Sequence, residues 1–280
     1  MRYHGGKFKD ARRIMPYFPE HCLYAELYGG GAGVLLQKPI SPQEIYNDLD
    51  GEIVNVFEVL RDKKTSSELY QSLRLTPYSY DEYLRSMDPS ENPVEQARRT
   101  LVRSWLGVSP SKFSRGRRNG FRSFRKDEPK CGLGQSWIKW KEEIPRFCER
   151  LESVVIENRP AIDLMKKCDG PNTLFYLDPP YLHDTRRGTS KKLAYKHEMS
   201  MEDHTELLET ILQLKSKVVL SCYDSPLYNE VLKGWEKISY SAVSSDNKDP
   251  KRKETLYMNF KRQPTLFESE KIVQNATNIF

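Results

Sequence analysis

No segment of this sequence is long and apolar enough to cross a membrane. The longest apolar stretches are short, such as the one from Val218 to Leu220, whereas a membrane-spanning helix needs about 20 apolar residues. The first residues also lack the apolar core of a secretory signal peptide. We therefore expect a cytosolic protein with no membrane partner.

Paired cysteines are absent as well. The five cysteines are scattered along the chain, and no two of them have the CxxC spacing of a zinc site. An odd, dispersed set of cysteines in a cytosolic chain is most simply reduced. We therefore expect structural cysteines and no metal centre.

The composition is that of a folded, soluble protein. Hydrophobic residues make up 38% and charged residues 30% of the 280 residues, which argues against a disordered chain. This length suits one sizeable α/β domain, alone or with a smaller insert. The net charge of +6 indicates a polyanionic partner only if the positive charge is concentrated in one place.

Short apolar segments alternate with helical patterns along most of the chain. The sequence predicts strands at 23–27, 44–48, 154–156, 174–177 and 217–221, and helices at 34–36, 52–60 and 200–214. This alternation predicts a parallel sheet that helices cover on both faces. Two further candidate strands, at 237–241 and 255–260, are separated by a polar excursion and predict an antiparallel pair at the sheet edge.

Residues 65–150 interrupt this alternation. They have the pattern of several helices around a polar segment, so we interpret them as an inserted second module. The sheet domain then consists of residues 1–64 and 151–262. The polar residues 263–280 form a tail that we expect to be loosely ordered.

A basic stretch lies inside the predicted insert. Seven of the fifteen residues 112–126 are Lys or Arg, none is acidic, and three phenylalanines are interleaved with them. Asn119 and Gly120 predict a two-residue hairpin turn, and a basic hairpin can read base edges in the major groove. A phenylalanine can fill the gap that a flipped base leaves. A solvated basic loop is the alternative. The residues predicted to bind DNA are Lys112, Arg115, Arg117, Arg118, Asn119, Phe121, Arg122 and Arg125.

The sharpest chemical signal comes directly after the predicted strand at 174–177. Asp178 is followed there by Pro179, Pro180 and Tyr181, and ligands bind at the carboxyl ends of such strands. Prolines make this loop rigid and leave its carbonyls free to accept hydrogen bonds. The Asp178 carboxylate and the Pro179 carbonyl could hold the two N–H bonds of an aryl amine and stabilise the positive charge that methylation places on its nitrogen. Tyr181 would stack on the base. An ordinary proline turn is the alternative.

A glycine-rich turn follows the first predicted strand, from Glu26 through Tyr28 to Gly30 and Gly31. Glycines let the backbone pass close to a ligand and direct the N–H groups of a following helix toward it. No GK[ST] follows, so the turn is not a phosphate-binding P-loop. A purely structural turn is equally consistent with this pattern.

Two charged residues, Asp48 and Lys7, stand beside a predicted strand end and a glycine pair. Asp48 ends the second predicted strand, about 20 residues after the glycine-rich turn begins, where an acidic residue can accept ribose hydroxyls. Asp48 on its own is more often a helix cap. Lys7 follows two glycines and Tyr3, and its ammonium could reach a carboxylate. A disordered basic N-terminus is the alternative for Lys7.

Taken together, the order of these signals resembles that of the Dam-like, alpha-group family of N6-adenine DNA methyltransferases, the DPPY type. The resemblance covers nearly the whole chain, with the glycine-rich turn first, Asp178 to Tyr181 late, and an insert between them. It implies a Rossmann-like methyltransferase fold, S-adenosyl-L-methionine as the methyl donor, and an adenine flipped out of double-stranded DNA as the substrate. It also implies a prokaryotic or phage-encoded enzyme, which we expect to be a monomer.

The resemblance assigns roles to individual residues. Lys7 and Tyr3 would meet the methionine end of the cofactor. Glu26, Tyr28, Gly30 and Gly31 would line its pocket, Asp48 would bind its ribose, and Asp178 would lie beside both the cofactor and the target amine. The family often has Glu-Pro-Phe where this chain has Glu26-Leu27-Tyr28, which keeps the aromatic ring and loses the proline.

Other functions share parts of this pattern. The same chemistry could act on RNA or on the N4 amine of cytosine, although the cytosine members more often carry serine before the two prolines. A non-catalytic DNA-binding subunit would be expected to have lost Lys7, Asp48 or Asp178. No endonuclease domain is evident in the sequence, so a partner in restriction–modification would be a separate chain.

The tail contains one further short pattern. Residues 263–267, from Gln263 to Phe267, resemble the Gln-x-x-Leu-Phe peptides with which bacterial proteins dock on the replication sliding clamp. A sliding clamp is the partner that this resemblance suggests. Packing of Leu266 and Phe267 onto the protein's own sheet is the favoured alternative, because such short patterns are common.

Overall fold

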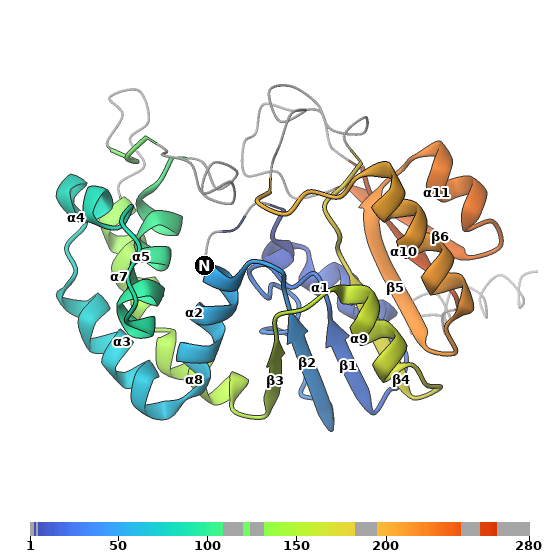
Figure 1. The fold of residues 1–280 in the computed structure, drawn as a ribbon, viewed down its shortest axis with the longest axis horizontal. Helices are drawn as coiled ribbons and strands as arrows, with labels where there is room; N and C mark the ends of the chain where they lie inside the picture. Colours follow the sequence, from blue (N-terminus) through green and yellow to red (C-terminus); the bar gives the residue numbers. More distant parts are fainter. Residues whose placement is uncertain are drawn as a thin grey trace, which may run out of the picture.

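Seven strands form a single sheet in the computed structural model, which describes Tyr3 and residues 5–108, 120–123, 132–182, 195–241 and 253–261. The strand order is β3-β2-β1-β4-β5-β7-β6 (Figure 1). The strands are β1 (Leu23–Glu26), β2 (Gln43–Asn47), β3 (Val154–Glu157), β4 (Thr173–Leu177), β5 (Lys217–Tyr223), β6 (Glu236–Ser241) and β7 (Lys253–Met258).

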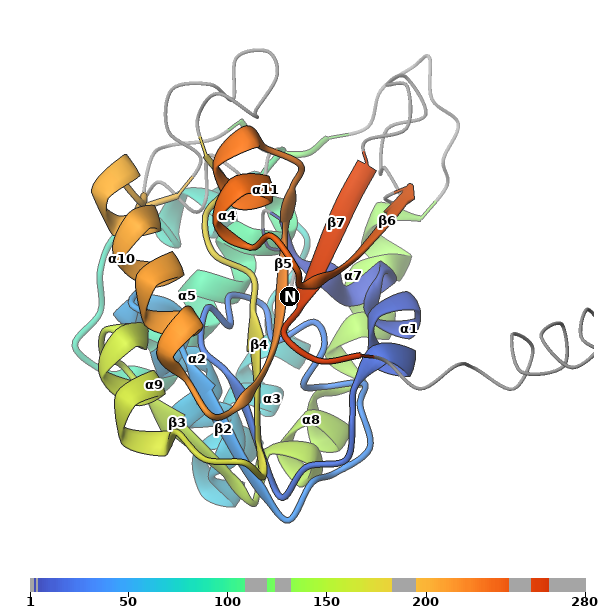
Figure 2. The same cartoon turned by 90° about the vertical axis from the view of Figure 1, so that its right-hand side faces the viewer.

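Strands β1 to β5 are parallel to one another, and β7 is antiparallel to both β5 and β6. Figure 2 shows β6 and β7 side by side at one edge of the sheet. The predicted Rossmann-like parallel sheet with an antiparallel edge is therefore confirmed, and β7 lies one position inside that edge.

Buried side chains alternate between the two faces of the sheet, because successive residues of a strand point to opposite sides. On β4, Leu174 and Tyr176 belong to one apolar core, while Phe175 and Leu177 belong to the other. The first core packs against α1 (Ala11–Ile14) and α2 (Gly51–Arg61), and the second packs against α9 (Ala161–Cys168), α10 (Met201–Gln213) and α11 (Pro226–Val231). Figure 2 shows α9 and α10 on one side of the sheet and α1 on the other. Helices cover both faces, as predicted.

The helix predicted at 34–36 is wrong, because residues 30–37 form a series of turns. Directly before residues 34–36, Gly30 and Ala32 adopt positive φ angles of 47° and 51°, so a right-handed helix cannot extend back through them. The Leu35 N–H is also bonded to the Glu26 carboxylate at 2.7 Å rather than within a helix. Three apolar residues in a row are too short a signal to set a helix against this local geometry.

The helices of the predicted insert are grouped beside the β3 edge of the sheet (Figure 1). Helix α5 makes its largest contact with α2, and α3 and α8 also pack on α2. The sheet domain and the helical module therefore share one continuous apolar core. The helices are α3 (Lys63–Leu75), α4 (Tyr80–Arg85), α5 (Pro93–Leu106), α7 (Leu133–Lys141) and α8 (Ile144–Leu151).

Within these described residues, no helix is both long and apolar enough to span a membrane.

Candidate active site

A pocket opens at the carboxyl ends of β1, β2 and β4, where a parallel sheet places its ligands. Its lining brings together most of the residues that the sequence singled out, although they are far apart in the chain. These lining residues are Tyr3, Lys7, Glu26, Tyr28, Gly30, Gly31, Asp48, Asp178 and Pro180. Pro179 is buried and is not among the residues that line the pocket.

The glycine-rich turn forms one wall of the pocket. Larger residues do not fit at two of its glycines. A Cβ atom on Gly29 would overlap the Tyr46 ring, and one on Gly30 would lie 2.7 Å from the Tyr3 ring. Gly30 also has a positive φ of 47°, which disfavours any side chain. At these two positions the turn therefore lines the pocket with backbone and no side chain.

Asp48 fixes the position of this turn. One of its carboxylate oxygens accepts a hydrogen bond from the Gly30 N–H at 2.7 Å, and the other accepts one from the Asp50 N–H at 2.8 Å. Burial raises the pKa of Asp48, while these hydrogen bonds act against that rise. Asp48 therefore joins the turn after β1 to the start of α2, as well as facing the pocket.

Lys7 and Asp178 form the charged centre of the site. Lys7 Nζ donates to the Oδ1 and Oδ2 atoms of Asp178 at 2.9 and 3.0 Å and to the hydroxyl of Tyr181 at 2.6 Å. The 3-10 helix η1 (Lys7–Lys9) presents the lysine, and the end of β4 presents the carboxylate. The short N-terminal segment is therefore part of the site rather than a loose end.

Glu254 on β7 is a second buried carboxylate beside this pair, and the sequence patterns did not predict it. Its Oε2 atom accepts a hydrogen bond from the Tyr181 hydroxyl at 2.6 Å and lies 3.9 Å from Lys7 Nζ. The Tyr181 ring packs edge-on against Tyr223, with centroids 4.4 Å apart. The stacking of Tyr181 on a base stays a prediction.

The pKa values of this centre follow from burial and from the charge balance. Burial alone would lower the pKa of Lys7, but the Asp178 and Glu254 carboxylates outweigh it and raise that pKa. Burial raises the pKa of Asp178 and of Glu254, and the Lys7 ammonium opposes both increases. One ammonium thus opposes the rise in pKa that burial causes in two neighbouring carboxylates.

Glu26 is a third buried carboxylate, and it predicts how stability depends on pH. Burial raises the pKa of Glu26 from 4.5 to about 7, against the hydrogen bonds from the Tyr24 hydroxyl and the Leu35 N–H. The folded state therefore binds this proton more tightly than the unfolded state, and the resulting stabilisation is lost as the pH rises from 4.5 to about 7. Glu26→Gln should thus be more stable than the wild type at about pH 8, by up to about 3 kcal/mol. At about pH 5 it should show no such gain.

Thermal melting of both proteins at the two pH values measures this effect. Glu44→Gln is the matched control, because its ion pairs with Arg150 and Lys38 outweigh burial and lower the pKa of Glu44. That control should lose stability at both pH values. If Glu26→Gln differs from the wild type by the same amount at both pH values, the pKa of Glu26 is not raised in the folded protein.

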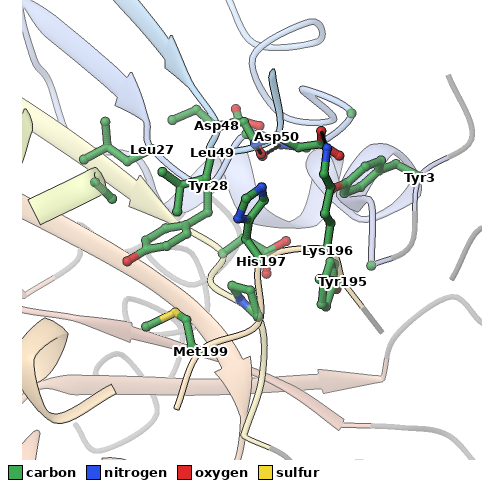
Figure 3. Close-up of a pocket in the computed structure, with 18 of the residues that line it drawn as sticks. Tyr3, Leu27, Tyr28, Asp48, Leu49, Asp50, Tyr195, Lys196, His197 and Met199 are labelled. Carbon is green, nitrogen blue, oxygen red and sulfur yellow. Dashed lines mark hydrogen bonds and ion pairs between the residues drawn. The ribbon is translucent and has the colours of Figure 1, made fainter. Parts of the chain in front are cut away.

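Sequence patterns gave no role to the segment from Tyr195 to Met199, yet all five of its residues line the pocket. Figure 3 shows this segment crossing the pocket between Tyr3 and Tyr28. Lys196 Nζ reaches Asp50 Oδ1 at 3.1 Å. The signal that could have identified the segment is its position directly before the N-cap Ser200 of α10, which brings it to the same sheet edge.

Of the basic stretch, the structure describes only residues 120–123, which include two of the residues predicted to bind DNA, Phe121 and Arg122. Phe121 forms an antiparallel bridge with Gly107, and the Arg122 N–H donates to the Leu106 carbonyl at 2.7 Å. The Phe121 ring packs among Tyr78, Tyr80 and Tyr83, which gives it a role in packing. Lys112, Arg115, Arg117, Arg118, Asn119 and Arg125 lie outside the described residues, as do the predicted turn at Asn119 and the peptide from Gln263 to Phe267.

The geometry of the site suits the binding of a cation or an amine. A rigid carboxylate lies at the end of β4, an exposed backbone turn lies opposite it, and further acidic side chains line the same pocket, including Glu26, Asp48 and Asp50. A carboxylate held in this way can accept a hydrogen bond from an amine and stabilise positive charge that develops on it.

Comparison with known proteins agrees with this chemistry. A family model described as D12 class N6 adenine-specific DNA methyltransferase matches residues 3–246. Among solved structures, a "putative rRNA-methylase from Clostridium thermocellum" is similar over 90% of this chain and 96% of its own, with 9% sequence identity and a TM-score of 0.38. A similarity this low carries no information about activity. The search of curated proteins finds no match. Because the family model spans most of the chain and the pocket residues from Tyr3 to Glu206, this protein belongs to the D12 class N6 adenine-specific DNA methyltransferases.

Proposed function

We propose that the enzyme transfers a methyl group from S-adenosyl-L-methionine to the N6 amine of an adenine flipped out of double-stranded DNA. The observation that carries the proposal is Asp178 at the carboxyl end of β4, at the edge of a pocket that the glycine-rich turn also lines. The family supplies the reaction class, and the pocket supplies a place for both the donor and the acceptor.

The pocket residues fit this cofactor. Gly29 and Gly30 line the pocket with backbone alone, because a side chain at either position would collide with the ring of Tyr46 or Tyr3. Asp48 faces the pocket and is suited to the ribose hydroxyls, and Lys7 is suited to the carboxylate of the methionine end. When bound, S-adenosyl-L-methionine supplies a methyl group activated by a positively charged sulfur.

The residues of this chain then orient the amine. Asp178 accepts one N–H of the adenine amine, and the Pro179 carbonyl accepts the other, which favours a pyramidal nitrogen with its lone pair toward the methyl group. Lys7 leaves Asp178 for this step, because its ammonium occupies both carboxylate oxygens in the structure. After transfer, the Asp178 carboxylate takes the extra proton from the methylated nitrogen.

We further propose that the insert at 65–150 recognises the DNA. The bridge between Gly107 and Phe121 holds together, beside α4, the ends of a segment that contains four of the seven basic residues, Lys112, Arg115, Arg117 and Arg118. Extrusion of a base from the duplex brings its amine within reach of a buried carboxylate. The basic residues between these ends supply phosphate and base contacts.

The test of this function is a methyl-transfer assay with purified protein and labelled S-adenosyl-L-methionine. Mass spectrometry of the hydrolysed product identifies the modified base, and duplex DNA, single-stranded RNA and adenine-free DNA serve as alternative substrates. The proposal requires N6-methyladenine in duplex DNA. Label in RNA alone would indicate an RNA methyltransferase instead. Label on cytosine N4 would indicate a cytosine methyltransferase.

The contributions of the basic stretch to specificity and affinity should be separable. Changing Arg117 or Arg118, which flank the predicted turn, should alter the sequence preference, whereas changing Lys126 should weaken binding to all DNA equally. Each lost base contact should cost about 1–3 kcal/mol at its position. Maps of methylated adenines from a methylation-free host that expresses each variant provide the measurement. An unchanged preference in both arginine variants would assign recognition to another segment.

A further inference from the structure

The hydroxyl of Tyr181 lies between two carboxylates and can serve only one of them at a time. It is 2.6 Å from Glu254 Oε2 and 2.9 Å from Asp178 Oδ1, and it accepts a hydrogen bond from Lys7. A phenol has a single hydrogen to donate. Whichever carboxylate receives that hydrogen becomes a weaker acceptor for another donor.

This choice affects the reaction directly. On the proposed function, Asp178 has to accept an N–H bond from the target amine, so a hydrogen bond from Tyr181 to the same carboxylate would compete with it. Glu254 offers the hydroxyl a shorter alternative bond from the opposite side. Glu254 can also face the Lys7 ammonium, 3.9 Å away, when that group leaves Asp178.

The position of Glu254 is unusual for a residue with a structural role alone. It lies 6% exposed on β7, paired with Tyr223 of β5 and Tyr240 of β6. A buried carboxylate is costly unless it is paired and hydrogen-bonded. The side chain of Glu254 contacts Tyr181 and Lys7, and both of these residues belong to the active site.

We propose that Glu254 is a positioning residue for methyl transfer, which takes the Tyr181 hydrogen and so leaves the Asp178 carboxylate free for the adenine amine. This inference rests on the proposed function. Glu254 touches neither the cofactor nor the base and acts through Tyr181 and Lys7.

A double-mutant cycle tests this role. Glu254→Gln keeps the size of the side chain but makes it a neutral, weaker acceptor, so the single-turnover rate should fall by roughly tenfold. Tyr181→Phe keeps the ring and removes the hydroxyl. In that background, Glu254→Gln should cost clearly less than the tenfold loss seen in the wild type, because the Tyr181 hydroxyl is gone and only the Lys7 contact of Glu254 remains. DNA affinity should change little in either variant.

The pH profile adds a readout that a purely structural role would not move. Loss of the Glu254 charge, and transfer of the Tyr181 hydrogen to Asp178, both favour the ionised form of Asp178, so the acid limb of the rate should move to lower pH. The titratable and charged groups that face Asp178 from the packed elements are Lys7, Asp10, Glu26, Tyr176, Tyr181, Tyr240 and Glu254. Glu44→Gln removes another buried carboxylate at the opposite end of the sheet and should leave the profile unchanged.

Two outcomes of the cycle would overturn the inference. The first is an equal loss of rate from Glu254→Gln in the wild-type and Tyr181→Phe backgrounds, and the second is no loss in either background. If Glu254→Gln melts at a lower temperature than the assay permits, Glu254→Met replaces it in the same cycle. If the wild-type protein transfers no methyl group to DNA, the proposed function fails and this inference fails with it, whereas an active wild type with an unaffected variant refutes the inference alone.

Discussion

Replacing Asp178 with alanine is expected to reduce methyl transfer by about a hundredfold or more while DNA binding stays close to that of the wild type. The carboxylate lies in the pocket and is bonded to Lys7 and Tyr181, so its loss removes the proposed acceptor for the amine and leaves the proposed DNA-recognition insert untouched. Asp178→Asn keeps one oxygen acceptor but loses the charge, so its rate should fall between those of the wild type and Asp178→Ala.

Single-turnover methyl transfer and DNA-binding titrations measure the two effects separately. Asp224→Ala is a suitable control, because Asp224 directly follows β5 at the same sheet edge but is 54% exposed and binds Lys237 outside the pocket. The control should retain wild-type transfer. Near-normal turnover in Asp178→Ala would refute the proposed mechanism.

Changing Lys7 to glutamine is expected to lower kcat/KM by about a hundredfold, since it removes the ammonium partner of a buried carboxylate. It also leaves Asp178 and Glu254 without their shared cation, so the pKa of each rises further. The active site then needs a higher pH to ionise Asp178, and the acid limb of the rate should move to higher pH. This shift is opposite in sign to the one expected for Glu254→Gln.

The measurement is the pH dependence of kcat/KM together with a cofactor-binding titration. Lys9→Gln is the matched control, because Lys9 belongs to the same 3-10 helix but its side chain is exposed. Its profile should superimpose on that of the wild type. A Lys7→Gln profile that also superimposes would mean that Lys7 has no electrostatic influence on Asp178.

The structure brings residues singled out by the sequence into one pocket where chemistry and chain position coincide. Asp178, Asp48 and Lys7 were identified because each stands beside a strand end or a glycine pair, and parallel strands bring such ends to one edge. Helix α10 was predicted from its N-cap, and Ser200 and Asp203 form a full capping box there.

Other parts of the site have no such local signature. Glu254 lies within a strand whose pairing with β5 is antiparallel, so only the register of the finished sheet places it beside Tyr181. The helix expected at 34–36 failed because a tertiary contact, the bond from the Leu35 N–H to Glu26, sets the backbone there. Long-range contacts of this kind are not encoded in the periodicity of short segments.

The bridge between Gly107 and Phe121 has a consequence for how recognition can change over time. Two segments, residues 106–108 and 120–122, form the ends of the recognition segment that we propose and are joined by backbone hydrogen bonds, and Phe121 contacts α4 through its aromatic ring. Substitutions, insertions or deletions between these ends therefore leave the core and the catalytic pocket in place. Under the proposed function, duplication and divergence of this one segment would give enzymes that methylate different DNA sites with the same chemistry.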